Sequence, residues 1–338
     1  MAHVNIPIFI PHMGCPNQCV FCNQRSISGQ RDFCVGDVER QIEAALSTVR
    51  QGDEVEIAFF GGSFTGIDRG LMITLLDIAQ RYVRADKVGS IRLSTRPDYI
   101  SDEILDILSG YSVRVIELGL QSMDDRVLKA SHRGHTAADA EKACRAVVSS
   151  GFVLVGQMMI GLPEATEESE TETARRIVSL GASAVRIYPT VVFYDTPLCE
   201  MTANGVYKPL TTEVAVARAA SVLRIFSQNG IPCIRIGLCA TEHLASPEKV
   251  LAGPNHPALG ELVWNAYYYG ELLDALRERG LLGCEVALHL PQAAVSKYVG
   301  QHRCNIERLL RETNTRVRKV VGDKKGNGVC PLAWHTAE

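Results

Sequence analysis

The chain lacks the features that would place it in or across a membrane. None of its apolar runs approaches the length of a transmembrane helix, and the start Met1-Ala-His-Val-Asn5 has neither the basic residues nor the apolar stretch of a secretory signal. We therefore expect a cytoplasmic protein without a membrane partner. Internal repeats and low-complexity segments are also lacking. A formal net charge of −3 gives the whole chain no strong preference for partners of either sign.

The chain does contain enough apolar residues for a sizeable core. Its 338 residues are 46% hydrophobic, which predicts one large domain or two unequal ones. Eleven cysteines are present, an odd number, and a chain of this size and type does not fit a disulfide framework. We expect the thiols to be reduced.

Strand-like and helix-like segments alternate from the start of the chain to about residue 237. Apolar runs predict strands at 4–10, 55–60, 91–94, 115–120, 153–160, 185–188 and 231–236, and helical patterns lie between them at 38–49, 71–83, 103–108, 137–149, 168–180 and 214–228. This alternation implies a parallel sheet covered by helices. We predict an α/β fold with a partial (β/α)6 TIM-like barrel at 1–240. A smaller α+β domain at 241–325 and a flexible tail at 326–338 would follow.

Three cysteines stand close together after the first predicted strand, with the spacing C-x3-C-x2-C at Cys15, Cys19 and Cys22. Iron–sulfur clusters are held by closely spaced cysteine thiolates, normally four of them, so three would leave one iron open to a non-protein ligand. Two other interpretations stay open here. The cysteines could be buried core residues, although packing gives no reason for their clustering. They could also bind zinc together with His12.

Glycine and polar residues occur where the predicted strands end, which is where ligands bind in parallel barrels. Gly61-Gly62-Ser63 follows the second strand, and glycines there let the backbone approach a ligand closely, although a glycine pair is more often only a turn. Polar residues stand at or after the later strand ends: Ser94, Gln121, Arg133, Gln157 and Tyr188. Core packing does not explain this series, so we expect a ligand at these strand ends.

The cysteine spacing, with Phe21 before the last cysteine, resembles the cluster loop of the radical S-adenosylmethionine (SAM) enzymes. The later motifs form an ordered set that is similar to the radical-SAM domain of the Elongator catalytic subunit, over roughly the first two thirds of the chain. They are Glu117-Leu-Gly-Leu-Gln121-Ser122, Arg133-Gly-His135, Gly161-Leu-Pro163 and Arg186-Ile-Tyr188-Pro-Thr190. The strand-end motifs are also similar to those of the oxygen-independent coproporphyrinogen oxidase group.

This resemblance implies a [4Fe–4S] cluster and SAM as cofactors. Cys15, Cys19 and Cys22 would ligate the cluster, and its open iron would bind the amino and carboxylate groups of SAM. The implied SAM contacts are Gly61, Gly62 and Ser63 at the methionine end, Arg133 near the carboxylate, Gln121 and Gln157 at the ribose, Phe21 near the adenine, and Ser94. Tyr188 is expected to take part in the chemistry, although a tyrosine at a barrel mouth can equally be a packing residue.

The chain also departs from these families. Members often carry Glu where this chain has Ser94, and Elongator-type chains have Lys where it has Arg186. The Elongator cysteine spacing is longer, and its acetyltransferase domain has no counterpart here. The resemblance therefore implies SAM cleavage more strongly than it implies the Elongator reaction.

The C-terminal third has a different pattern. A strand at 285–290, a short helix at 292–299, a turn at 300–303, a second helix at 305–313 and a strand at 315–321 are predicted, an order similar to a KH domain core. In KH modules a GXXG turn clamps nucleic-acid backbone, and here Arg303 replaces the second glycine. Residues 297–325 carry +6 and the rest of the chain −9, as expected for a nucleic-acid contact or, alternatively, for solvated helices. The predicted RNA contacts are Lys297, Gly300, Arg303, Arg308 and Arg311.

The leading hypothesis is a radical SAM enzyme that cleaves SAM reductively to a 5′-deoxyadenosyl radical and acts on RNA, in particular tRNA. It would need an electron donor such as flavodoxin or ferredoxin. One alternative keeps the same chemistry on a small molecule, as in the coproporphyrinogen oxidase group. Another is a zinc-stabilised nucleic-acid-binding module without catalysis, but such a module has no need for the strand-end motifs.

Overall fold

The computed structural model describes residues 3–15, 19–24, 33–238, 248–324 and 328–334. It divides the chain into two compact units, Met1–Pro257 and Ala258–Glu338. The larger unit is built on a parallel sheet of seven strands in the order β1-β2-β3-β4-β5-β6-β8, which curls into an open half-barrel. The strands are β1 (His3–Ile10), β2 (Glu54–Gly61), β3 (Ser90–Thr95), β4 (Val113–Gln121), β5 (Val153–Ile160), β6 (Ala184–Pro189) and β8 (Cys233–Ile236). The predicted partial barrel is confirmed.

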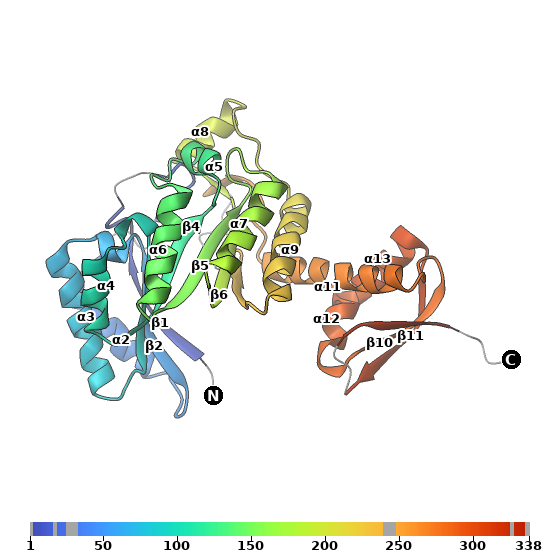
Figure 1. The fold of residues 1–338 in the computed structure, drawn as a ribbon, viewed down its shortest axis with the longest axis horizontal. Helices are drawn as coiled ribbons and strands as arrows, with labels where there is room; N and C mark the ends of the chain where they lie inside the picture. The colour runs from blue at the N-terminus through green and yellow to red at the C-terminus, as the bar shows by residue number, and fades with distance from the viewer. Residues whose placement is uncertain (1–2, 16–18, 25–32, 239–247, 325–327, 335–338) are drawn as a thin grey trace. The chain divides into compact units, whose positions relative to one another are not determined.

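Helices follow the strands and cover the outer face of the sheet, and Figure 1 shows α6 and α7 against its central strands. The predicted helices are present as α2 (Val38–Leu46), α3 (Arg69–Arg84), α4 (Asp102–Ser109), α6 (Ala137–Ser149), α7 (Glu167–Ser179) and α9 (Thr212–Gln228). Hydroxyl side chains cap four of them: Ser101, Thr136, Thr166 and Thr211 each accept a hydrogen bond from a backbone N–H of the first turn. Two short helices, α5 (Asp125–Ala130) and α8 (Pro197–Ala203), were not predicted.

The two faces of the sheet differ in chemistry because side chains alternate along each strand. The outer face is apolar and tightly packed: a β carbon on Gly156 of β5 would lie 2.9 Å from Ile177 of α7. The opposite face carries Arg92, Glu117 and Gln157, on three neighbouring strands. The helices therefore bury the apolar face, and the polar face is left for a site.

The smaller unit begins with the long helix α11 (Leu259–Glu278). It continues with β10 (Glu285–Pro291), α12 (Val295–Val299), α13 (Cys304–Thr313), β11 (Arg316–Asp323) and β12 (Cys330–Ala333). β10 pairs parallel to β11 and antiparallel to β12. Its core includes Tyr269, Leu288, Tyr298 and Leu309. The predicted β-α-turn-α-β order is present, and the aromatic residues of α11 serve packing.

Two predicted boundaries differ from the structure. The larger unit extends past 240, because β9 (Val250–Ala252) pairs with β7 (Val192–Phe193) and thereby joins this segment to the barrel. The tail predicted to be flexible from 326 contains β12, whose backbone pairs with β10. Both pairings join segments distant in sequence, which local patterns do not reveal. None of the helices in the described ranges is long and apolar enough to span a bilayer.

Candidate cofactor site and nucleic-acid interface

The segment before the cysteines packs on the end of β2. The Gly62 N–H donates to the Ile10 carbonyl at 2.8 Å, and the Ser63 N–H donates to the Met13 carbonyl at 2.9 Å. A β carbon on Gly62 would overlap the Met13 carbonyl oxygen, and Gly61 has a φ of +114°. Glycine is therefore required at both positions for the chain to fold this way. This packing role was not predicted, and the SAM contacts of Gly61, Gly62 and Ser63 stay a prediction.

The three cysteines lie around this packed corner. The Cys15 sulfur is 3.6 Å from the hydroxyl of the buried Ser63. Cys19 is buried, whereas Cys15 and Cys22 are half-buried. Burial, together with the charges of Cys19 and Cys15, raises the pKa of Cys22 to about 12, and Arg133 opposes this shift. Three thiols that influence one another in this way need a cation among them to ionise together.

These donors fit an iron–sulfur cluster better than a zinc ion. In the described ranges no three His, Cys, Asp or Glu side chains are grouped closely enough for one metal ion. A cluster does not need that grouping, because each cysteine binds a different iron. His12, the fourth ligand in the zinc interpretation, accepts a hydrogen bond at Nε2 from the Gln24 N–H, at 3.1 Å. The structure therefore does not favour the zinc interpretation.

Arg133 lies beside the cysteines and is buried. Its Nη1 donates to the Cys19 sulfur at 3.4 Å, and its Nη2 donates to the Gly119 carbonyl at 2.6 Å. Its Nε is buried and has no hydrogen-bond partner within the described part of the chain. An unsatisfied cationic donor is rare in a folded interior, and it fits a ligand with a carboxylate, such as SAM.

The two glutamines predicted to contact the ribose are brought together. Gln157 Nε2 donates to Gln121 Oε1 at 3.3 Å. Gln121 has a left-handed φ of +67°, at an irregularity where the register between β4 and β5 shifts. A β carbon on Gly119 would lie 2.9 Å from Gln121 Nε2 and from Arg133 Nη2. Gly119 thus leaves room for both predicted cofactor contacts, a role that we did not predict.

Tyr188 belongs to a second polar group, which includes charged residues on the same face of the sheet. Its hydroxyl oxygen accepts a hydrogen bond from Arg186 Nη1 at 3.2 Å, and Arg186 Nε lies 3.0 Å from a carboxylate oxygen of Glu117. The same oxygen of Glu117 is 4.0 Å from Arg92, and Ser94 is paired with Glu117 in the β3–β4 register. The tyrosine phenol therefore keeps its own O–H as a donor.

Burial sets the titration of this second group. It raises the pKa of Glu117, although Arg186 and Arg92 oppose the shift, and it raises the pKa of Tyr188. Sequence reasoning gave Glu117 and Arg92 no role. Their position on the polar face of neighbouring strands was the signal that could have identified them.

Phe21 packs in an apolar cluster with Val20, Val192, Leu198 and Tyr207. Backbone hydrogen bonds hold this segment: Val20 N–H donates to the Ser131 carbonyl at 3.2 Å, and Leu198 N–H donates to the Val20 carbonyl at 2.9 Å. The predicted adenine contact of Phe21 stays a prediction.

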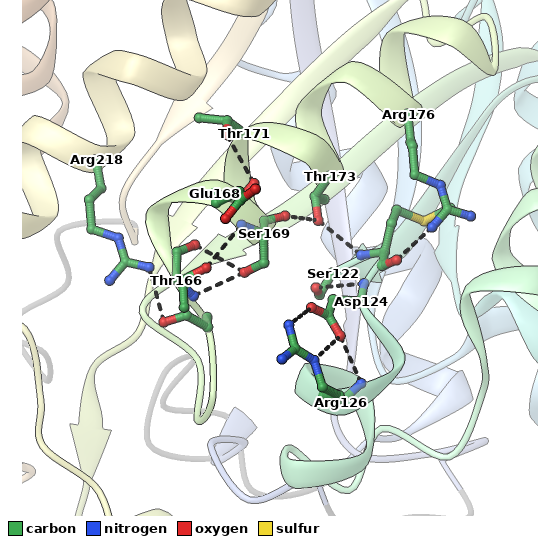
Figure 2. A network of polar contacts seen from close by, with 12 residues as sticks. Ser122, Asp124, Arg126, Thr166, Glu168, Ser169, Thr171, Thr173, Arg176 and Arg218 are labelled. Carbon is green, nitrogen blue, oxygen red and sulfur yellow. Dashed lines mark hydrogen bonds and ion pairs between the residues drawn. The ribbon is translucent and has the colours of Figure 1, made fainter.

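A polar network supports the segment that follows β4. Figure 2 shows Thr173 and Arg176 of α7 reaching this segment, where Thr173 Oγ1 accepts from the Met123 N–H at 3.0 Å and Arg176 Nη1 donates to the Met123 carbonyl at 2.6 Å. In the same view Asp124 caps α5 and holds Arg126. Met123, two residues after Gln121, is thus held by α7, and the next residue, Asp124, caps α5.

In the smaller unit, the turn between α12 and α13 has an unusual backbone. Gly300, His302 and Arg303 all have a left-handed φ, of 75°, 49° and 62°. Asn305 holds the turn, because its side-chain amide donates to the Tyr298 carbonyl at 3.1 Å. Non-glycine residues in this conformation are strained, and such strain concentrates at functional sites.

The predicted RNA contacts differ in their surroundings. Lys297, Arg303 and Arg311 are exposed. Arg308 instead lies over the Tyr269 ring, 4.1 Å from its centroid, and pairs with Glu312 at 2.9 Å. Lys297 likewise lies over an aromatic ring, that of Tyr268, 6.0 Å from its centroid. Arg308 thus also has contacts within its own unit, and its RNA contact stays a prediction. Lys325 lies outside the described residues.

Comparisons with known proteins identify the family. The model of the Radical SAM superfamily matches residues 9–177, half of the chain, and a Radical SAM C-terminal domain matches 182–268. An uncharacterised protein of Methanocaldococcus jannaschii is 30% identical over 218 residues, 61% of this chain and 66% of that protein. A tRNA uridine(34) acetyltransferase of Methanocaldococcus infernus is 32% identical over 127 residues, 37% of this chain but only 24% of that protein.

A solved structure supports the fold. The archaeal Elp3 of Methanocaldococcus infernus, with an N-terminal deletion, aligns with a TM-score of 0.60 at 20% identity and covers 83% of this chain and 64% of that one. The chain spans less than two thirds of each of these relatives. Fold, family model and relatives agree with the predicted resemblance. The chain belongs to the radical SAM superfamily of enzymes, whose cofactors are a [4Fe–4S] cluster and S-adenosylmethionine.

Proposed function

We propose that this radical SAM enzyme acts on RNA, with tRNA as the substrate class. The observation that carries the proposal is the smaller unit. Its KH-like order of elements presents a strained turn and exposed cations: Lys297, Arg303, Arg311, Lys319 and Lys324. None of these five forms an ion pair with another residue in the described ranges. The similarity to a protein named for tRNA uridine(34) acetylation supports the same substrate class.

The cofactors would be held in the larger unit. Cys15, Cys19 and Cys22 would ligate the cluster, and Arg133 with its unsatisfied Nε would face the carboxylate of SAM. Gln121 and Gln157 offer amide groups for hydroxyl partners, and the remaining contacts follow the sequence prediction. Together the bound cofactors supply one-electron chemistry, the reductive cleavage of SAM that yields a carbon-centred radical.

The residues of this chain have separate tasks in such a reaction. The half-barrel excludes water from the polar face, where a reactive radical must be protected from side reactions. Tyr188 retains an O–H donor because its oxygen accepts from Arg186. We therefore assign Tyr188 the positioning of a substrate acceptor group, with Glu117 and Arg186 fixing the orientation of its ring.

The cofactor part is tested by iron binding. Anaerobically reconstituted protein should bind about four irons per chain with a broad visible charge-transfer band. Single alanine variants of Cys15, Cys19 and Cys22 should lose the band, while Cys144→Ala and Cys284→Ala, outside the site, should keep it. Stoichiometric zinc without iron uptake would support the zinc interpretation instead.

The RNA part is tested by binding and turnover. The protein, reduced by flavodoxin or ferredoxin, should bind tRNA and release 5′-deoxyadenosine from SAM faster when tRNA is present. Cluster and SAM cleavage without any RNA binding at low salt would favour a small-molecule substrate.

A further inference from the structure

Arg133 makes a contact that its predicted role toward SAM does not explain. Its Nη1 donates to the sulfur of Cys19, 114 positions earlier in the chain, at 3.4 Å. Both residues are buried, with 7% and 5% of their surface exposed. A guanidinium buried against a thiol is well placed to compensate a negative charge on that sulfur.

The guanidinium is fixed in place by neighbouring groups. Its Nη2 donates to the Gly119 carbonyl at 2.6 Å, and the absence of a side chain at Gly119 leaves the space that it fills. The backbone is held as well, because Arg96 Nη2 donates to the Arg133 carbonyl at 2.6 Å. Asp98 in turn accepts two hydrogen bonds from Arg96, at 2.9 and 2.8 Å. Three segments of the barrel therefore converge to hold one arginine.

His135 adds a neutral neighbour to this arrangement. Its side chain is fully buried, with Nδ1 3.9 Å from Asp98. Burial lowers the pKa of His135 to about 4, so His135 is neutral at neutral pH. It therefore adds no positive charge beside Arg133.

We propose that Arg133 is a positioning residue for the cluster: its hydrogen bond to the Cys19 sulfur stabilises the reduced cluster and raises its reduction potential. Hydrogen bonds to cluster sulfurs and nearby charge set such potentials, and reduction adds one negative charge that a cation stabilises. The inference rests on the proposed ligation by Cys19. It concerns the protein before SAM binds, so it is separate from a contact with the SAM carboxylate.

The test is a potentiometric titration of the reconstituted full chain without SAM, followed by the electron paramagnetic resonance signal of the reduced cluster. In Arg133→Met the reduction equilibrium should shift against the reduced cluster by roughly tenfold, about 59 mV for a one-electron couple. Arg133→Lys, which keeps the charge, should shift less. Gly119→Ala should shift the potential in the same direction, because the new methyl group displaces the guanidinium without removing it.

The control is Arg126→Met, which removes an exposed arginine that is paired with Asp124 on the nearby helix α5. Its potential should equal that of the parent. A parent-like potential in Arg133→Met at full iron content would overturn this inference but leave the proposed cluster ligands intact. If that variant binds no iron, unchanged potentials in both Gly119→Ala and Arg133→Lys would overturn it. A parent that forms no cluster would overturn the inference together with the proposed ligands.

Discussion

Reversing two exposed charges, one at the α12–α13 turn and one in the last turn of α13, in the double variant Arg303→Glu and Arg311→Glu, should remove most RNA binding without affecting the barrel. Both side chains are exposed, and neither forms an ion pair with another described residue, so the reversal breaks no ion pair among the described residues. RNA binding should weaken because fewer phosphates are neutralised. Each cation that contacts a phosphate releases counterions from the RNA, and this release favours binding.

The structure gives the magnitude. Between residues 297 and 324 five exposed cations form no ion pair with another described residue: Lys297, Arg303, Arg311, Lys319 and Lys324. If all five contact phosphates, the slope of log affinity against log salt should be about −4, or roughly 250-fold weaker binding between 50 and 200 mM salt. Two reversals should reduce the slope to about −2 and weaken binding at least about tenfold at 100 mM salt.

Fluorescence anisotropy with labelled tRNA over a salt series measures both quantities. Arg279→Glu is the matched control, since Arg279 is exposed in the same unit but follows α11 rather than lying at the turn. Arg308→Glu should instead reduce the stability of the unit by about 1 kcal/mol, because it breaks the contacts with Tyr269 and Glu312. Equal slopes for parent and double variant would refute the reasoning.

Three further predictions concern the larger unit. Gly62→Val should prevent cluster incorporation, measured as bound iron, because its side chain would overlap the Met13 carbonyl; normal iron content would contradict the packing role. Glu117→Ala should destabilise the fold by about 3 kcal/mol, seen as a lower Tm, because Arg186 loses a buried carboxylate 3.0 Å away; an unchanged Tm would argue that the pair is unimportant. His135 has a folded pKa of about 4 against 6.5 unfolded, so the unfolded state binds more protons between these values and stability falls as the pH drops from 6.5 toward 4. Parent protein should lose about 2 kcal/mol more than His135→Asn between pH 7.5 and 5, and parallel stability curves would exclude this cause.

Local patterns were sufficient to predict the architecture. The apolar run 153–160 and the helix pattern 137–149 match β5 and α6 at both ends. Hydroxyl residues that stand directly before helix starts in the sequence form caps in the structure, as at Thr166. These features depend on neighbouring residues, so a sequence contains what is needed to infer them.

Contacts between distant segments could not be predicted in this way. The Arg133–Cys19 hydrogen bond spans 114 positions, and the pairing of β12 with β10 depends on how the chain returns to the sheet. The contact of Arg308 with Tyr269 of α11 is a second example, because the basic pattern of residues 297–325 gives no sign that an aromatic ring of a distant helix lies beside this cation. The sequence shows which charged residues a segment carries, whereas the packing of the fold decides which of them can contact a partner.

Action on RNA, as proposed above, would require the radical to remove a hydrogen atom from the RNA itself. The most direct measurement uses bulk tRNA labelled with deuterium at its carbon-bound positions, incubated with the reduced, reconstituted protein and unlabelled SAM. Mass spectrometry of the released 5′-deoxyadenosine then reports the origin of the abstracted atom. We predict that the parent protein releases deuterated 5′-deoxyadenosine and that the Cys19→Ala variant releases none. Abundant 5′-deoxyadenosine without deuterium, in the presence of bound tRNA, would contradict an RNA substrate.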